Sequence, residues 1–178
     1  MFELPEVETI ARKLKTGEID SPRIIGEEIK FIDVLWERTL AVPSVLKAKT
    51  TLMGRSIHDV SRRGKFIIID MDQVYLLIHL RMSGDLLVVS PGKIIDINHR
   101  RFELHFVSGI DLIFNDPRKF GRVWLVNDPA DVTGKIGPEP LEESFSLELF
   151  HEMLLKKKRQ LKPLLMDQTF LAGMGNIY

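Results

Sequence analysis

The stretch Phe102-Glu-Leu-His-Phe-Val-Ser-Gly-Ile-Asp-Leu-Ile-Phe-Asn115 shows most clearly how the chain folds. Apolar residues at positions 102, 104 and 106 alternate with Glu103 and His105, which is the period of a strand with one buried face. The Ser-Gly pair at 108–109 is typical of a tight turn, and the apolar run Asp111–Asn115 follows it. The stretch therefore predicts an antiparallel hairpin whose phenylalanines lie in a core.

Similar short runs, rich in isoleucine, valine and leucine, occur on both sides of this hairpin. They are Ile29–Trp36, Lys65–Asp70, Val74–Leu80, Asp85–Val89 and Arg122–Val126. Because no helical pattern separates them, they favour an antiparallel sandwich or barrel. Ahead of them, apolar residues at positions 7, 10, 11 and 14 predict a helix over Leu4–Lys15.

The chain changes character after the last of these runs. The segment Asp128–Ser144 contains three prolines and two glycines, which is typical of a connector. Helical spacing then appears in Ser146–Lys158, and Pro163 suits the start of another short helix. We therefore predict a mainly β protein with some α-helix. An N-terminal helix and a two-sheet antiparallel β-sandwich, or else a barrel, occupy residues 1–130, a linker residues 131–144, and a helical module residues 145–178.

Composition excludes several classes of protein. The chain of 178 residues is 44% hydrophobic and carries 25 basic and 25 acidic residues, so it is not a disordered tail. It has no cysteine, which excludes disulfides and thiolate zinc sites. It has no uncharged apolar run of about 18 residues, and its first nine residues, with three glutamates and no basic residue, do not form a secretory signal. We expect a soluble, cytoplasmic protein without a membrane segment.

The basic residues leave two interpretations open, whereas the histidines leave one. Basic residues gather at 62–65, 100–101, 118–122 and 156–162, either as ordinary solvated surface or as one face for phosphates. The histidines at positions 58, 79, 105 and 151 lack metal-ligand spacing, so they are interpreted as structural or surface residues and no metal site is predicted.

Seven short motifs follow one another along the whole chain. They are Met1-Phe-Glu-Leu-Pro-Glu-Val-Glu-Thr9, Arg62-Arg-Gly-Lys65, His79-Leu-Arg-Met-Ser-Gly84, Asn115-Asp-Pro-Arg-Lys-Phe-Gly121, Ile136-Gly-Pro-Glu-Pro-Leu141, Lys162-Pro-Leu-Leu-Met-Asp-Gln168 and Ala172-Gly-Met-Gly-Asn-Ile-Tyr178. In this order they resemble the formamidopyrimidine-DNA glycosylase (Fpg, or MutM) family. The resemblance implies a β-sandwich followed by the first part of a helix–two-turns–helix module. It also implies base excision repair, in which oxidised purines such as 8-oxoguanine and formamidopyrimidines are flipped out of duplex DNA and removed, with associated AP-lyase activity.

The resemblance also assigns catalytic roles. Glu3 matches the general acid–base that acts on the sugar, Glu6 helps to arrange the site, and Lys65 reaches the phosphate beside the lesion. The family's nucleophile is the amine of an N-terminal proline, and Phe2 stands at that position. A bulky second residue generally blocks removal of Met1, so the amine would be displaced by about 3.5 Å. The alternative is therefore a catalytically impaired fragment that binds damaged DNA without lyase activity, and a folded remnant without activity is a third interpretation.

Six further residues match DNA contacts of the family. Three would fill the hole left by the flipped nucleotide and three would contact the DNA backbone. The first three are Met82, Arg118 and Phe120, and the others are His99, Lys157 and Asn176. Arg81 stands where the family usually has glycine.

Family members continue beyond the position of Tyr178. The resemblance implies that the rest of the helical module and a four-cysteine zinc finger have no counterpart here, so no cofactor is expected. The apolar residues Leu164, Leu165, Phe170 and Leu171 would then lose their cover. The expected partner is double-stranded DNA containing damaged bases, and the expected state is a monomer.

Overall fold

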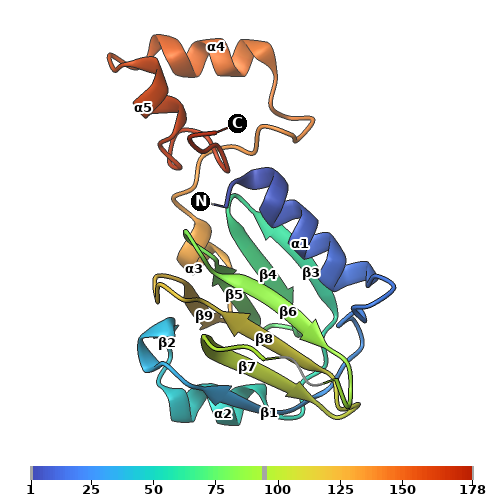
Figure 1. Cartoon of the computed structure of the whole chain (residues 1–178). Helices are drawn as coiled ribbons and strands as arrows, with labels where there is room; N and C mark the ends of the chain where they lie inside the picture. Colours follow the sequence, from blue (N-terminus) through green and yellow to red (C-terminus); the bar gives the residue numbers. More distant parts are fainter. Residues whose placement is uncertain (1, 94–95, 178) are drawn as a thin grey trace.

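The computed structural model describes residues 2–93 and 96–177, which form a β-sandwich and a smaller helical lobe (Figure 1). Helix α1 (Leu4–Thr16) carries a proline in its first turn and buries Leu4, Val7, Ala11 and Leu14 along one face. This face packs against the sandwich, where its main contacts are with strand β3 (Asp59–Arg63). The start of α1 lies at the junction between the two parts, so the first residues of the chain face the helical lobe (Figure 1).

Two sheets form the sandwich. The first is antiparallel throughout and has the order β1 (Ile29–Val34), β7 (Arg100–Phe106), β8 (Asp111–Asn115) and β6 (Asp85–Val89). The second has the order β2 (Leu40–Val42), β9 (Arg122–Val126), β5 (Tyr75–His79), β4 (Phe66–Asp70) and β3, with β2 parallel to β9 and the other pairs antiparallel. The predicted two-sheet sandwich with an N-terminal helix is confirmed, with one short parallel pairing at an edge.

The core lies between the sheets. Phe102 and Phe106 of β7 and Phe114 of β8 are almost completely buried, as the alternation in the hairpin predicts. Each such aromatic side chain contributes on the order of 2–3 kcal/mol by leaving water. These contacts make the sandwich a firm support for the loops at its ends.

The expectation that no helix interrupts the strands is wrong. Helix α2 (Val45–Leu52) covers β1, and the 3₁₀ turn η1 (Glu37–Thr39) precedes β2. Helix α2 is short and buries only Ala48 and Leu52, so its apolar periodicity is weak, although Ser44 caps it by accepting the N–H of Lys47.

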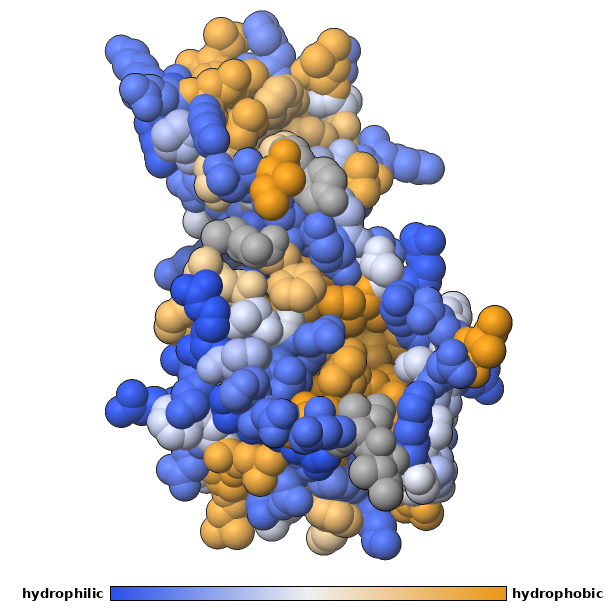
Figure 2. All heavy atoms as spheres, in the orientation of Figure 1, coloured by the Kyte–Doolittle hydropathy of each residue, from blue (hydrophilic) through white to orange (hydrophobic). Residues whose placement is uncertain are grey.

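The helical lobe has its own small core. After α3 (Ala130–Thr133) the chain forms α4 (Leu147–Leu155) and α5 (Leu161–Leu165), which starts two residues before the proline that was expected to open it. The expectation that Leu164, Phe170 and Leu171 lack cover is wrong, because they pack together against Phe145, Phe150, Met153 and Leu154. The exposed apolar residues of the lobe include instead Leu147, Leu149, Leu155, Leu161 and Ile177, and hydrophobic surface is visible over α4 and α5 (Figure 2).

A buried carboxylate ties the linker to the sandwich. Glu139 accepts hydrogen bonds from Arg62 (2.8 Å), Arg63 (2.9 Å) and the backbone N–H of Gly64; we call these four residues the Glu139 cluster. Arg63 also donates to the carbonyl of Gly137. The basic residues at 62–63 are therefore structural, and the interpretation of this pair as a free phosphate-binding face is wrong.

None of the helices within residues 2–93 and 96–177 combines the length and the hydrophobicity needed to cross a bilayer.

Candidate active site

Glu3 connects the two ends of the chain. It is buried immediately before α1, and its Oε1 accepts the backbone N–H groups of Asn176 (2.7 Å) and Ile177 (2.9 Å). The N–H of Glu3 donates to Glu6 Oε2 at 3.0 Å. A Cβ atom on Gly175 would overlap the carboxylate of Glu3, so only glycine allows this approach. The structure thus brings Glu3, Glu6 and Asn176 together.

The loop that presents these N–H groups is held by Gln168. Its side-chain NH₂ donates to the carbonyls of Met166 (3.0 Å) and Met174 (2.8 Å), and its Oε1 accepts the N–H of Gly173 (2.9 Å). The carbonyl of Gly173 in turn accepts the N–H of Leu4 at 3.1 Å. The helical lobe is therefore fixed against the start of α1 at the point where Glu3 lies.

A cavity of about 570 Å³ lies between the sandwich and the helical lobe. Its lining combines cationic side chains with apolar ones. The sandwich contributes Lys65, His79, Arg81, Met82, Phe120 and Arg122, and the helical lobe contributes Met166, Gln168 and Met174. Three residues predicted from the sequence (Lys65, Met82 and Phe120) thus share one cavity.

Lys65 lies immediately before β4 and is only 7% exposed. Burial lowers the pKa of its ammonium group below the usual value, while the charges of Glu3 and Glu6 act in the opposite direction. The net shift is downward, so more of the amine is neutral near pH 7 than in a solvated lysine.

His79, the last residue of β5, is a cavity residue that sequence reasoning missed. Burial, together with the nearby charges of Arg81 and Lys65, lowers the pKa of His79 to about 3. Its Nδ1 accepts the N–H of Arg81 at 3.1 Å, so the neutral ring carries its proton on Nε2. The sequence feature that could have identified His79 was its position at the start of the His79–Gly84 motif. Arg122 and Gln168 were missed in the same way, at the ends of two other quoted stretches.

Asp116 organises the loop beside the cavity. It is buried, and its carboxylate accepts hydrogen bonds from Ser83 Oγ (2.6 Å), the N–H of Gly121 (2.7 Å) and the N–H of Arg118 (3.2 Å). These bonds join the segment that carries Met82 to the segment 116–121. Residues 116–121 therefore form a turn whose conformation is fixed by hydrogen bonds to Asp116.

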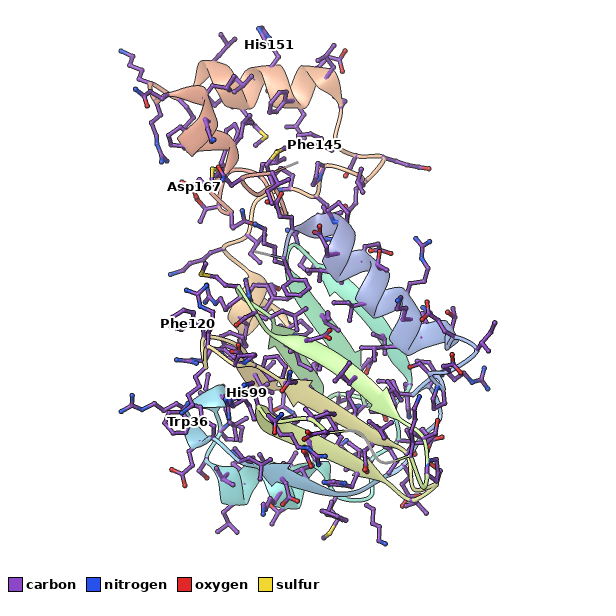
Figure 3. The ribbon with its side chains drawn as sticks, in the orientation of Figure 1. Trp36, His99, Phe120, Phe145, His151 and Asp167 are labelled. Carbon is purple, nitrogen blue, oxygen red and sulfur yellow. The ribbon has the colours of Figure 1, made fainter. Side chains whose placement is uncertain are left out.

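This turn exposes the residues predicted to form a wedge. Phe120 is 49% exposed and Met82 is 43% exposed, although both are large apolar side chains. The guanidinium of Arg118 lies 5.1 Å from the centre of the Phe120 ring, within the range of a cation–π contact. The structure thus brings Met82 and Phe120 to the cavity and Arg118 beside Phe120, with Phe120 along one side of the molecule (Figure 3).

The remaining predicted DNA contacts lie outside the cavity. His99 is exposed, and its carbonyl accepts the N–H of Asp116 at 2.9 Å, which places it next to the same turn (Figure 3). Asn176 is exposed and lines a separate hollow of about 250 Å³ together with Lys162. Lys157 is exposed just beyond α4 and does not line the cavity.

Phe2 is not among the described residues that line the cavity, although its backbone contacts one of them. Its ring is partly buried against the core and lines a hollow of about 430 Å³ with Pro5, Thr9 and Ile10. Its N–H donates to the carbonyl of Arg81 at 3.3 Å. Whether Met1 remains attached concerns a position outside the described residues.

A separate group of side chains could hold a metal ion. The ligand atoms of Asp33, Glu103 and His105 lie within 4.8 Å of one another, brought together by the pairing of β1 with β7. His105 Nδ1 also contacts Asp111 Oδ1 at 2.7 Å. Sequence spacing gave no sign of this group because its members come from two strands. The described lining of the 570 Å³ cavity contains one histidine and no carboxylate, so it offers no comparable ligand set.

Comparisons with known proteins agree with this arrangement. Residues 1–123 match the family model of the formamidopyrimidine-DNA glycosylase N-terminal domain, and residues 136–178 match that of the formamidopyrimidine-DNA glycosylase H2TH domain. A formamidopyrimidine-DNA glycosylase of Protochlamydia amoebophila is 43% identical over all of this chain and 63% of its own length. The corresponding protein of Chloroflexus aurantiacus is 41% identical over all of this chain and 63% of its own length.

Solved structures give the same result. The glycosylase of Lactococcus lactis, bound non-covalently to DNA containing an AP site, has a TM-score of 0.86 and 36% identity, covering 98% of this chain and 66% of that one. The Lactococcus lactis protein with Fapy-dG-containing DNA also has a TM-score of 0.86, covering 99% of this chain and 65% of that one. The chain spans about 63% of the length of the curated relatives named above. With both of its parts matched, the chain belongs to the formamidopyrimidine-DNA glycosylase family.

Proposed function

We propose that this chain forms the catalytic part of a base-excision DNA glycosylase that removes oxidised purines from duplex DNA. The observation that carries the proposal is the exposed pair Met82 and Phe120, with Arg118 beside Phe120, on a cavity that also contains Lys65 and a neutral His79. Proteins of similar structure were solved with DNA containing an abasic site or Fapy-dG.

Each part of this geometry suits one step of base flipping. A flipped nucleotide needs a pocket of a few hundred Å³, and the 570 Å³ cavity meets that need. Apolar wedge residues reduce the cost of unstacking, which is a few kcal/mol per step. Met82 and Phe120 provide the wedge, and Arg118 faces the orphaned base.

The cavity also suits a phosphate-rich substrate. Lys65, Arg81 and Arg122 place three cationic side chains on its wall. Glu3 supplies the general acid–base, and the N–H groups of Asn176 and Ile177 fix the position of its carboxylate. His99, Lys157 and Asn176 are proposed contacts to the DNA backbone, in line with their exposure.

AP-lyase activity is part of the proposal. The position of Phe2 favours an alternative in which the chain binds damaged DNA without cleaving it. Lyase chemistry needs an amine that forms an imine with the sugar. The absence of Phe2 from the described lining of the cavity supports this second candidate function, namely recognition of damaged DNA without strand cleavage. We further propose that the protein works as a monomer in the cytoplasm and that this chain needs no cofactor.

Binding and base release test the proposal separately. The chain should bind a duplex containing 8-oxoguanine or a tetrahydrofuran abasic analogue more tightly than undamaged duplex, with an affinity that falls as salt rises. Phe120→Ala should weaken lesion binding, whereas Met53→Ala, at an exposed residue beside α2, should not. Equal, undetectable binding to all duplexes at low salt would contradict the proposed function. Lesion binding without release of the oxidised base would select the non-catalytic alternative.

A further inference from the structure

We propose that Lys65 is the nucleophilic amine of this chain and forms the imine with the aldehyde of an abasic deoxyribose. This inference rests on the proposed function and identifies the residue that would carry its lyase step. It differs from what the resemblance implies, which is a phosphate contact for Lys65 and attack by an amine at the position of Phe2.

The composition of the cavity is the first argument. Among the described residues that line it, Lys65 alone carries a primary amine. The other cations, Arg81 and Arg122, have guanidinium groups that stay protonated in proteins and are not nucleophiles. His79 is neutral but has Nδ1 occupied as a hydrogen-bond acceptor.

The position of Lys65 is fixed by its neighbours. Gly64, with a φ of +54°, donates its N–H to the buried carboxylate of Glu139. Phe66, on the other side, begins strand β4 and packs edge-on against His79, with 4.7 Å between ring centres. These contacts fix the backbone on both sides of Lys65, so its side chain starts from a defined point on the cavity wall.

The surroundings of Lys65 suit both the attack and its product. Burial favours the neutral amine, which is the reactive form, by lowering the pKa of the group. The negative charges of Glu3 and Glu6 act to raise the pKa of the same nitrogen, so they favour its positively charged form. A protonated imine carries such a charge, so the same carboxylates favour the intermediate.

The structure gives the position of Phe2 a different task. Its N–H is engaged with the carbonyl of Arg81, and its ring lines the separate hollow of about 430 Å³ together with Pro5 and Ile10. While Met1 is attached, the nitrogen of Phe2 is a peptide nitrogen without a reactive lone pair.

The step balances without a further reagent. The lone pair of neutral Lys65 Nζ forms a bond to C1′ of the open-chain sugar, and the carbonyl oxygen leaves as water after taking both amine protons, which yields the imine. Protonation makes the imine an electron sink. Loss of the C2′ proton to a base then allows the C3′–O bond to break, and the phosphate leaves with the electron pair.

Borohydride reduction tests the inference on the whole chain with a duplex that carries one abasic site. The expected result is a covalent protein–DNA adduct that peptide mapping places on Lys65. Lys65→Arg should lower the adduct yield by roughly 10²-fold or more, the scale expected for loss of a positioned group. Its binding to the tetrahydrofuran duplex should stay within about threefold because arginine keeps the charge. Lys162→Arg, at a lysine beside the smaller hollow, is the matched control and should trap like the wild type.

A second variant, in which Lys65 is unchanged, keeps the test informative if Lys65→Arg does not fold. Two extra residues before Met1 displace the terminal amine, and trapping should persist at the wild-type level. An adduct mapped to the terminal amine, or loss of trapping in the extended variant, would overturn the inference while leaving the proposed lyase function intact. Tight binding to the tetrahydrofuran duplex without any adduct would overturn the inference and select the binding-only alternative. Absence of binding to every duplex would defeat the proposed function itself.

Discussion

Replacing Glu139 by glutamine should destabilise the protein far more than its place in a proline-rich linker suggests. The side chain of Glu139 is 4% exposed, and that of Arg62, its closest charged partner, is 10% exposed. The substitution keeps the shape of the side chain but removes the charge that compensates Arg62 and Arg63. A buried guanidinium would then face an amide NH₂ group, which cannot accept its hydrogen bond.

The partners of Glu139 set the size of the effect. Breaking a buried ion pair by removing one member costs about 3–5 kcal/mol. The lower end applies here, because Arg62 keeps its contact with Glu8 at 2.9 Å and Arg63, 30% exposed, can recover water. A loss of about 3 kcal/mol corresponds to a fall in Tm of roughly 6–12 °C for a chain of this size.

The pH dependence has a definite sign. Burial acts to raise the pKa of Glu139, but the hydrogen bonds from Gly64, Arg62 and Arg63 outweigh it and hold the pKa below the ordinary 4.5. The folded state therefore binds the proton more weakly than the unfolded state. The stabilisation by Glu139 is complete above about pH 4.5 and is lost as the pH falls through the folded pKa, so wild type and variant should converge in acid.

Thermal and urea denaturation followed by circular dichroism at pH 7 and at acidic pH measures both effects. Glu142→Gln is the control, since this neighbouring carboxylate is exposed. A Tm shift for Glu139→Gln of under about 2 °C at pH 7, the scale of a surface substitution, would refute the argument that the Glu139 cluster holds the linker. A stability gap that persists unchanged in acid would refute the assignment of the effect to the ionised carboxylate.

Three further outcomes follow from the site. Gly175→Ala should lower both Tm and base release, because a Cβ there displaces the carboxylate of Glu3; unchanged melting and activity would show that the close approach is unimportant. Arg81→Gly should raise the stability by about 1 kcal/mol, since Arg81 has a φ of +59° that favours glycine; a lower Tm would mean that its side-chain contacts outweigh the strain. The ring of His79, with its pKa lowered to about 3, should show no titration in NMR spectra between pH 8 and 5; a midpoint near the ordinary 6.5 would contradict its burial as the controlling factor.

The central hairpin could be predicted from sequence because its signals are local. Alternation along β7 and the turn that follows it define both strands and the buried face without reference to the rest of the chain. Strands β2 and β3 escaped prediction for the opposite reason. The sequence of β3, Asp59–Arg63, has one apolar residue, and β2 has three residues in all, so their partners β4 and β9 impose the extended conformation.

The candidate site was predictable only where a motif pointed to it. The meeting of Glu3 with Asn176 joins residues 173 positions apart, and no periodicity in the sequence contains that contact. Glu139 shows the limit of composition, because a glutamate between two prolines in a connector looks like solvated surface until its arginine partners are placed. His79 could not be found from the spacing of histidines along the chain. What sets it apart is its burial in the cavity wall, which lowers its pKa.

Two attachments hold the helical lobe against the sandwich beside the cavity. One lies at the Glu139 cluster, where the linker leaves the sandwich, and the other lies at Glu3, where residues 176–177 return to it. Swinging the lobe away would break both sets of hydrogen bonds, and separating the buried carboxylate of Glu139 from its arginines costs several kcal/mol. Under the proposed function, we therefore expect a nucleotide to enter past the exposed side chains of Met82 and Phe120 rather than by separation of the two parts. The same coupling gives the helical lobe a part in the proposed chemistry, because the backbone N–H groups of Asn176 and Ile177 hold the carboxylate of Glu3, the proposed general acid–base.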